Sequence, residues 1–188
     1  MDAIEIFFTV YGALLALAVA KLMSNVARIA RARDGIRIGW SMPLFMLLLL
    51  LDICSLINNG GRILGLADLS LRLVTNGVIT ASLYYLLATL TAPNDGGKTT
   101  DLDDYYDRHR PLLIGGMALG SVLGFEVNAV LIRGFSETLE ARWMGLNATL
   151  MFAFYLLLAV LLFVRNRAVN HVALAILNAI FLVVLFTF

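Results

Sequence analysis

Two carboxylic acids, Asp52 and Glu126, lie inside long apolar stretches of the sequence. Asp52 follows an unbroken run of leucines, and Glu126 is the one charged residue between Arg110 and Arg133. A charge in the middle of a membrane helix costs at least about 2.5 kcal/mol on insertion scales. We therefore expect both acids to face protein or a water-filled cavity, where they would share or exchange protons.

Neutral polar residues accompany these acids. A helix rises about 1.5 Å per residue, so the depth of each residue in the membrane can be counted from the midpoint of its predicted helix. Asp52 and Glu126 both lie about 5 Å from the midpoint, toward the outer side of the membrane. Amides and a tyrosine fall in the same half or near the middle: Tyr11, Asn76, Asn128, Asn147 and Asn178. The predicted site is a cavity for an ion or small polar solute, lined by Asp52, Glu126, Asn76, Asn128, Asn147 and Asn178. The alternative is that the acids only fix helix packing through hydrogen bonds.

The segment from Thr100 to Pro111 combines acids, tyrosines, arginines and a histidine. Thr100 and Asp103 have the spacing of a capping box, which predicts a short interfacial helix before a membrane span that opens at Pro111. Asp103, Asp107 and His109 are alternative metal ligands. The spacing lacks the glycine and the final glutamate of an EF-hand, so we expect no metal here.

Several familiar motifs of enzymatic or cofactor chemistry are absent from the sequence. It has a single cysteine, Cys54, no Gly-x-Ser-x-Gly turn and no His-Glu-x-x-His helix. His109 and His171 are weak grounds for a haem. We expect no cofactor, and an enzyme is the least favoured of the classes considered.

The composition explains where these residues must lie. Of 188 residues, 61% are hydrophobic and only 14% are charged, which is too little charge to cover a surface in water. The mean hydropathy is +0.88. A span needs roughly 20 helical residues. The sequence predicts one all-α membrane domain over 1–188, with spans at 5–27, 38–60, 70–92, 111–133, 143–165 and 168–188.

The distribution of basic residues predicts the orientation, because positive loops stay in the cytoplasm. One side receives Arg28, Arg31, Arg33, Arg37, Lys98, Arg108, Arg110, Arg165 and Arg167; the other receives Arg62, Arg72, Arg133 and Arg142. Both termini are then outside a cell membrane, which we expect to be a bacterial inner membrane. The net charge of +1 gives no reason to expect nucleic acid as a partner.

Two further patterns predict contacts. Gly116, Gly120 and Gly124 form a stripe that allows close helix packing within the chain or between subunits, and Gly12, Ala16 and Ala20 are its expected partner. A basic cluster suits anionic lipid headgroups, and it consists of Lys21, Arg28, Arg31 and Arg33.

The arginine-rich exit of the first span, the following Ile38-Gly39-Trp40 and the Tyr105-Tyr106-x-x-His109-Arg110 stretch resemble a diffuse group of small bacterial multi-pass membrane proteins of uncharacterised function. The resemblance implies a multi-pass membrane fold and no particular activity.

Two functions remain open. The first is transport or conduction of an ion or small polar solute through the acid-lined cavity. The second is an accessory subunit that binds anionic lipid, a second copy of the chain or another membrane protein. An isosteric amide at Asp52 or Glu126 separates them, because a packing acid tolerates that change and an ion-handling acid does not.

Overall fold

The computed structural model describes residues 3–31, 37–63, 70–93, 101–134, 138 and 146–187. This part of the chain is helical and forms no strand. Its helices are α1 (Ala3–Arg31), α2 (Ser41–Ile63), α3 (Leu71–Leu90), α4 (Leu102–Ser121), α5 (Asn128–Arg133), α7 (Leu146–Phe163) and α8 (Arg167–Thr187). A π-helical segment, η1 (Val122–Val127), joins α4 to α5 without a break. The predicted all-α class is confirmed.

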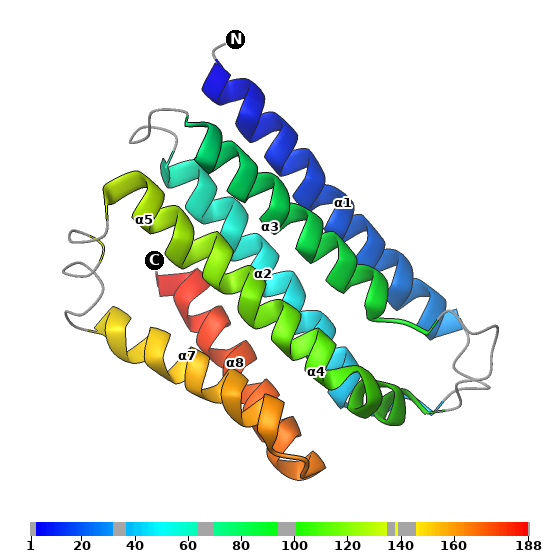
Figure 1. Cartoon of the computed structure of the whole chain (residues 1–188). Helices are drawn as coiled ribbons and strands as arrows, with labels where there is room; N and C mark the ends of the chain where they lie inside the picture. The colour runs from blue at the N-terminus through cyan, green and yellow to red at the C-terminus, as the bar shows by residue number, and fades with distance from the viewer. Residues whose placement is uncertain are drawn as a thin grey trace.

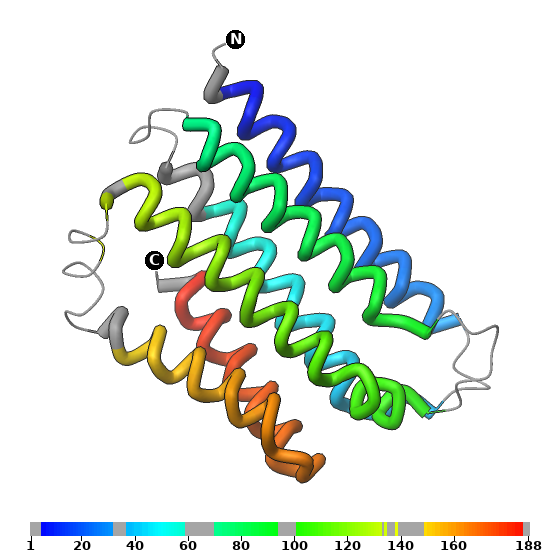
Figure 2. The backbone as a smooth tube through the Cα atoms, in the orientation of Figure 1, coloured from blue at the N-terminus to red at the C-terminus, as the bar shows by residue number. Residues whose placement is uncertain are grey.

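The helices form an elongated antiparallel bundle (Figure 1). α1 packs against α3, α2 packs against α8, and α7 contacts both α8 and α4. α2 also contacts α1 and α4, and α4 also contacts α3, so both helices have neighbours on several sides. The polar end of the bundle is the end with Arg31, Arg37, Asp101 and Arg167. The backbone trace shows that α1 begins and α8 ends at the opposite end, the terminal end (Figure 2).

Several of these helices are long and apolar enough to cross a membrane. The five longest stretches are Glu5–Arg31, Ser41–Asn58, Leu71–Leu90, Leu102–Ile132 and Arg167–Leu185, and the apolar part of α7, Thr149–Phe163, is shorter. Large apolar side chains point out of the bundle, such as Leu17, Leu86 and Phe152. A surface of this kind needs lipid around it, so the chain is a membrane protein with five to six helices of spanning character.

The segment expected as a separate interfacial helix is instead the beginning of α4. The helix starts at Leu102 and continues through Pro111 into the apolar part of the chain. Its N-cap is Asp101, whose carboxylate accepts hydrogen bonds from the backbone N–H groups of Asp103 and Asp104. The prediction that Thr100 caps this helix in a capping box with Asp103 is therefore wrong, because the cap is one residue later, at Asp101. An aspartate caps a helix as well as a threonine does. Because Asp101 caps α4, the Asp103 side chain is not used in a capping box and is available to contact another helix.

The glycine stripe of α4 and η1 lies against α3 and α2. An added Cβ at Gly116 would be 2.6 Å from Leu87 Cδ2, and one at Gly124 would be 2.4 Å from Leu56 Cδ2. Gly120 would meet the ring of Tyr84 at 2.8 Å. The prediction that Gly12, Ala16 and Ala20 of α1 pack against this stripe is wrong. The side chains that meet the stripe belong to α3 and α2, and nothing lies within 4 Å of an added Cβ at Gly12. These glycines are required because side chains from α3 and α2 occupy their places.

Candidate functional site

Asp52 lies in the interior of the bundle, fully buried between α2, α3 and α4. The Tyr84 hydroxyl donates a hydrogen bond to its Oδ2 atom, and Ser121 Oγ donates to the same oxygen at 3.2 Å. Ser121 Oγ also lies 2.9 Å from the carbonyl of Met117, one turn earlier in its own helix. Asp52 Oδ1 is buried and has no hydrogen-bond partner in the described part of the chain. The acid is thus held by hydroxyl groups rather than by a basic side chain.

Asn76 and Asn128 form a second polar group, closer to the terminal end. Asn76 Nδ2 donates to Asn128 Oδ1 at 2.7 Å and to the carbonyl of Leu123 at 2.9 Å. Asn128 Nδ2 donates in turn to the carbonyl of Gly124 at 3.0 Å. Both carbonyls belong to η1, where the wider π-helical turn changes the ordinary i to i+4 hydrogen-bond pattern. The two amides therefore join α3 to the π-helical segment.

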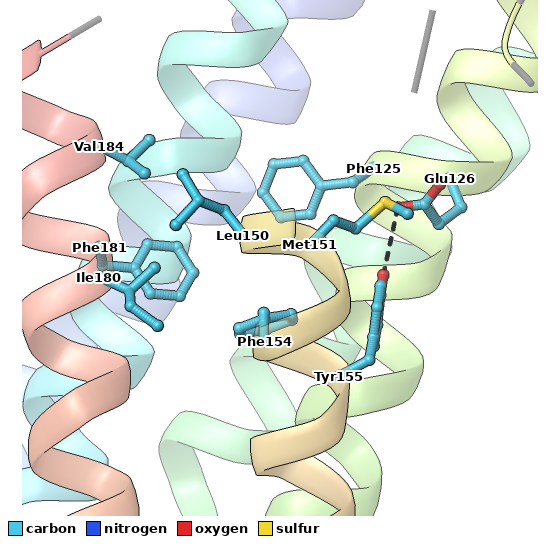
Figure 3. A pocket seen from close by; sticks show the side chains of 9 residues that line it. All are labelled: Phe125, Glu126, Leu150, Met151, Phe154, Tyr155, Ile180, Phe181 and Val184. Atoms are coloured by element: carbon cyan, nitrogen blue, oxygen red, sulfur yellow. Dashed lines mark hydrogen bonds between the residues drawn. The ribbon is translucent and has the colours of Figure 1, made fainter. Parts of the chain in front are cut away.

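Glu126 lies on η1 and lines a pocket between η1, α7 and α8 (Figure 3). The pocket has a volume of about 150 Å³. The Tyr155 hydroxyl on α7 donates to Glu126 Oε1 at 3.3 Å. The rest of the lining is aromatic and aliphatic: Phe125, Leu150, Met151, Phe154, Ile180, Phe181 and Val184. One carboxylate and one hydroxyl thus provide the polar side-chain atoms of a mostly apolar pocket.

The predicted cavity residues are distributed over several places. Asp52 is bonded to Tyr84 and Ser121, whereas Glu126 lines the pocket beside α7. Gly124 of the same segment faces Leu56 of α2. Because Glu126 lies two residues further along, it points to the other side of the helix.

The remaining predicted cavity residues also differ in their surroundings. Asn178 on α8 is buried, and its Nδ2 donates to the carbonyls of Leu44 on α2 and Leu174 one turn earlier. Asn147 lies in the first turn of α7, where its side chain is outside the described residues. Tyr11 is buried and stacks on Phe7, with ring centroids 5.9 Å apart. Asn178 therefore joins α8 to α2 rather than to the acids.

The acids and the histidine considered as metal ligands have separate partners at the polar end. Asp103 Oδ1 accepts a hydrogen bond from the backbone N–H of Ser41 at 2.9 Å and so caps the start of α2. Asp107 pairs with Arg167 at 2.8 Å. His109 Nδ1 lies 3.0 Å from the Tyr105 carbonyl, and its ring stacks on that of Tyr105. Among the described residues, no three His, Cys, Asp or Glu side chains are placed to hold a metal.

The first turns of α4 also bind the ends of three other helices. The Tyr105 hydroxyl donates to the carbonyl of Leu90 at the end of α3, at 3.1 Å. Arg110 Nη1 donates to the carbonyl of Val164, just after α7, at 2.6 Å. Arg167 at the start of α8 pairs with both Asp104 and Asp107. The unusual composition of this segment is explained by its contacts with neighbouring helices.

The basic cluster lies along the last turns of α1. Arg28 Nη2 donates to Asn25 Oδ1 at 3.4 Å, and Asn25 Nδ2 in turn donates to the carbonyl of Ala88 on α3. Arg31 is exposed, and its Nε donates to the carbonyl of Ala27. Lys21 is half-buried, two turns before Arg28. Arg33 lies outside the described residues.

Sequence reasoning missed Tyr84, Ser121 and Tyr155, the hydroxyl partners of the two acids. Tyr84 and Ser121 are fully buried, and Tyr155 lies within the apolar α7. The available signal was a hydroxyl in an apolar helix, which needs a hydrogen-bond partner when it is buried. That signal does not identify the partner, because the partner lies on another helix.

The fold and composition define a class, an all-α membrane protein with five to six helices of spanning character. No family model matches the chain, and no curated protein and no solved structure is significantly similar to it.

Proposed function

We propose that the protein binds a small, mostly apolar solute with an amino group in the pocket between η1, α7 and α8 and moves it across a membrane. The main observation in support of the proposal is the pocket itself. Its volume of about 150 Å³ equals that of an engineered protein cavity that accepts benzene. Small-molecule sites are typically apolar with a few placed polar groups, and this pocket has Glu126 and Tyr155 in that role.

The chemistry of the lining supports an amine as the polar part of the solute. Glu126 offers carboxylate oxygens, which are the strongest acceptors for a charged amine. Phe125, Phe154, Tyr155 and Phe181 line the same pocket, and aromatic ring faces attract cations. An aliphatic and aromatic solute body would occupy the remaining space.

The position of the pocket supports movement of the solute. Glu126 belongs to a π-helical segment inside a longer helix, and such segments occur frequently at functional sites. In the proposed topology all six helices span the membrane and the polar end is cytoplasmic. The pocket, which includes Leu150 near the start of α7 and Val184 near the end of α8, then lies toward the outer surface.

An accessory subunit is the second candidate, and the surroundings of Asp52 favour it. Asp52 is fully buried and its hydrogen bonds go to Tyr84 and Ser121, as expected of an acid that fixes helix packing. On this view the protein binds another membrane protein or anionic lipid and moves no solute.

Binding of benzylamine tests the proposal, with benzyl alcohol as the neutral analogue of the same shape. We expect Glu126→Gln in lipid nanodiscs to weaken benzylamine binding about tenfold or more, because a hydrogen bond to a charged group contributes about 1.5–3 kcal/mol. Benzyl alcohol binding should change far less. Tyr155→Phe should weaken both ligands modestly, and Glu5→Gln and Tyr85→Phe are matched controls outside the pocket. Calorimetry gives the affinities.

Uptake of radiolabelled benzylamine into liposomes then tests movement. We expect saturable uptake with wild-type protein and a strong reduction with Glu126→Gln. Binding without uptake above that of empty liposomes would contradict transport and leave a binding protein. The absence of saturable benzylamine binding by wild-type protein would overturn the proposal and favour the accessory subunit.

A further inference from the structure

A second hollow lies on the outside of the bundle, between α1 and α2 at the polar end. This α1–α2 groove has a volume of about 340 Å³, and Met23, Ile29 and Ala30 of α1 form one wall. Pro43, Met46 and Leu50 of α2 form the other, and all of its lining side chains are apolar. Several lining residues, including Ile38 and Leu47, are more than 40% exposed. Such an apolar surface needs a ligand or lipid to cover it.

The length of the groove indicates what covers it. From Met23 to Ala30, and again from Pro43 to Leu50, the lining extends over eight residues, so its two ends are about 10 Å apart along each helix. Half of a hydrocarbon core about 30 Å thick is about 15 Å, so the groove is short enough to fit within one leaflet. A transmembrane helix of a partner would need a surface along the whole core. The dimensions therefore fit one acyl chain of a lipid.

The residues at the open end of the groove indicate the headgroup. Ala30 in the lining is followed by Arg31, and Ile38 is preceded by Arg37. Both arginines are exposed; the Arg37 side chain is 83% exposed even though it lies 3.8 Å from Asp101. Trp40, which is 72% exposed, belongs to the same connection, and tryptophans concentrate at the headgroup level of membranes. Two exposed cationic residues thus adjoin the lining of the groove in the sequence.

We infer that the α1–α2 groove is a binding site for an anionic phospholipid, with one acyl chain between the helices and the headgroup beside Arg31 and Arg37. The inference is independent of the proposed solute pocket, because the groove shares no residue with it. The site lies at the cytoplasmic surface in the proposed topology, the surface where anionic lipids carry the negative potential.

Quenching of Trp40 fluorescence tests this inference. The chain has two tryptophans, so Trp143→Phe leaves Trp40 as the reporter. The protein is reconstituted into vesicles in which brominated phosphatidylglycerol or brominated phosphatidylcholine replaces part of the phosphatidylcholine. We expect brominated phosphatidylglycerol to quench more strongly than brominated phosphatidylcholine. The association constant of phosphatidylglycerol, relative to that of phosphatidylcholine, should be about fivefold higher for each arginine that contacts the headgroup. The preference should decrease in Arg31→Gln and Arg37→Gln and disappear in the double variant.

A matched pair of alanine substitutions tests the groove itself. Ala30 lines the groove, whereas Ala27 is exposed on the same turn and does not line it. We expect Ala30→Phe to abolish the phosphatidylglycerol preference and Ala27→Phe to retain it, with unchanged circular dichroism in both. If Ala30→Phe unfolds the protein, Ala30→Val and Ala27→Val provide a milder pair.

Three results would overturn the inference. The first is equal quenching by the two lipids in the wild-type background. The second is an equal effect of the Ala30 and Ala27 substitutions, which would place the lipid elsewhere. The third is conversion of a dimer to a monomer by Ala30→Phe, measured by light scattering, which would assign the groove to a second copy of the chain.

Discussion

The ring of Tyr84 on α3 lies directly against Gly120 on α4, where an added Cβ would be 2.8 Å from ring carbon Cε2. The hydroxyl of the same tyrosine donates to the buried carboxylate of Asp52 on α2. One side chain therefore joins the glycine stripe to the intramembrane acid. The close approach of α3 and α4 at Gly120 positions the hydroxyl that Asp52 requires.

We predict that Gly120→Ala lowers the free energy of unfolding by about 1–3 kcal/mol, the usual cost of an extra methyl group in a packed interior. Gly115→Ala is the matched control, because nothing lies within 4 Å of a Cβ there. Alanine should be neutral or slightly stabilising at Gly115, since it favours the helix more than glycine does. Reversible unfolding in mixed detergent micelles measures both. Equal stability of the two variants would contradict the packing described for Gly120.

We predict that Tyr84→Phe lowers the free energy of unfolding by about 1–2 kcal/mol, because it leaves the buried Asp52 carboxyl without its main donor. Tyr85→Phe is the control at the neighbouring, exposed position, and it should have no effect. Asp52→Asn retains an oxygen that accepts from Tyr84, so it should cost less than Tyr84→Phe. A double-mutant cycle of Tyr84→Phe with Asp52→Asn measures the coupling, and additive effects would show that the two residues do not interact.

We predict that Asp103→Ala loosens the start of α2, because its carboxylate caps the backbone N–H of Ser41. The loss should be about 1 kcal/mol, and Asp103→Asn should restore most of it because an amide oxygen is also a good cap. Asp104→Ala removes an exposed ion pair with Arg167 and should cost less than about 1 kcal/mol. Hydrogen exchange at the first turn of α2 should increase for Asp103→Ala alone. Unchanged exchange there would argue against a capping role.

We predict that the polar end faces the cytoplasm, because basic residues of the alternate connections gather on that side. In a Cys54→Ser background, cysteines at Ala32 and Asn166 should be protected from a membrane-impermeant maleimide in intact cells. Cysteines at Ala67 and Thr138 should react. Labelling of the cysteine at position 32 from outside would contradict the predicted orientation. Labelling at only one of positions 32 and 166 would contradict the predicted number of spans.

Most of the helices could be predicted from the sequence because each requires only length and apolar character. The predicted spans 70–92 and 168–188 differ from α3 and α8 by a few residues. The sequence predicts that the fourth span starts at Pro111, whereas α4 starts at Leu102. A proline can lie within a helix when neighbouring groups compensate for its missing N–H, and contacts of Asp103, Tyr105 and Arg110 with other helices hold these first turns in place.

The candidate site was only partly predictable. Asp52 and Glu126 were recognisable because a carboxylate in an apolar run is costly wherever its helix lies. Their partners depend on how each helix is rotated about its axis, which places Asp52 toward Tyr84 and Ser121 and Glu126 toward Tyr155. The π-helical segment around Glu126 also had no signature in the residue types.

The sequence by itself determined that this chain is a helical membrane protein, because apolar stretches of this length must satisfy their backbone hydrogen bonds internally within lipid. It also determined which polar residues would be costly there, since the cost of burying a charge depends mainly on the residue and its depth. Only the tertiary structure decided that Asp52 meets hydroxyl groups in the interior while Glu126 lines a separate pocket. That separation depends on close packing at Gly120 and Gly124, where contacts between helices far apart in the sequence set the face that each helix turns inward.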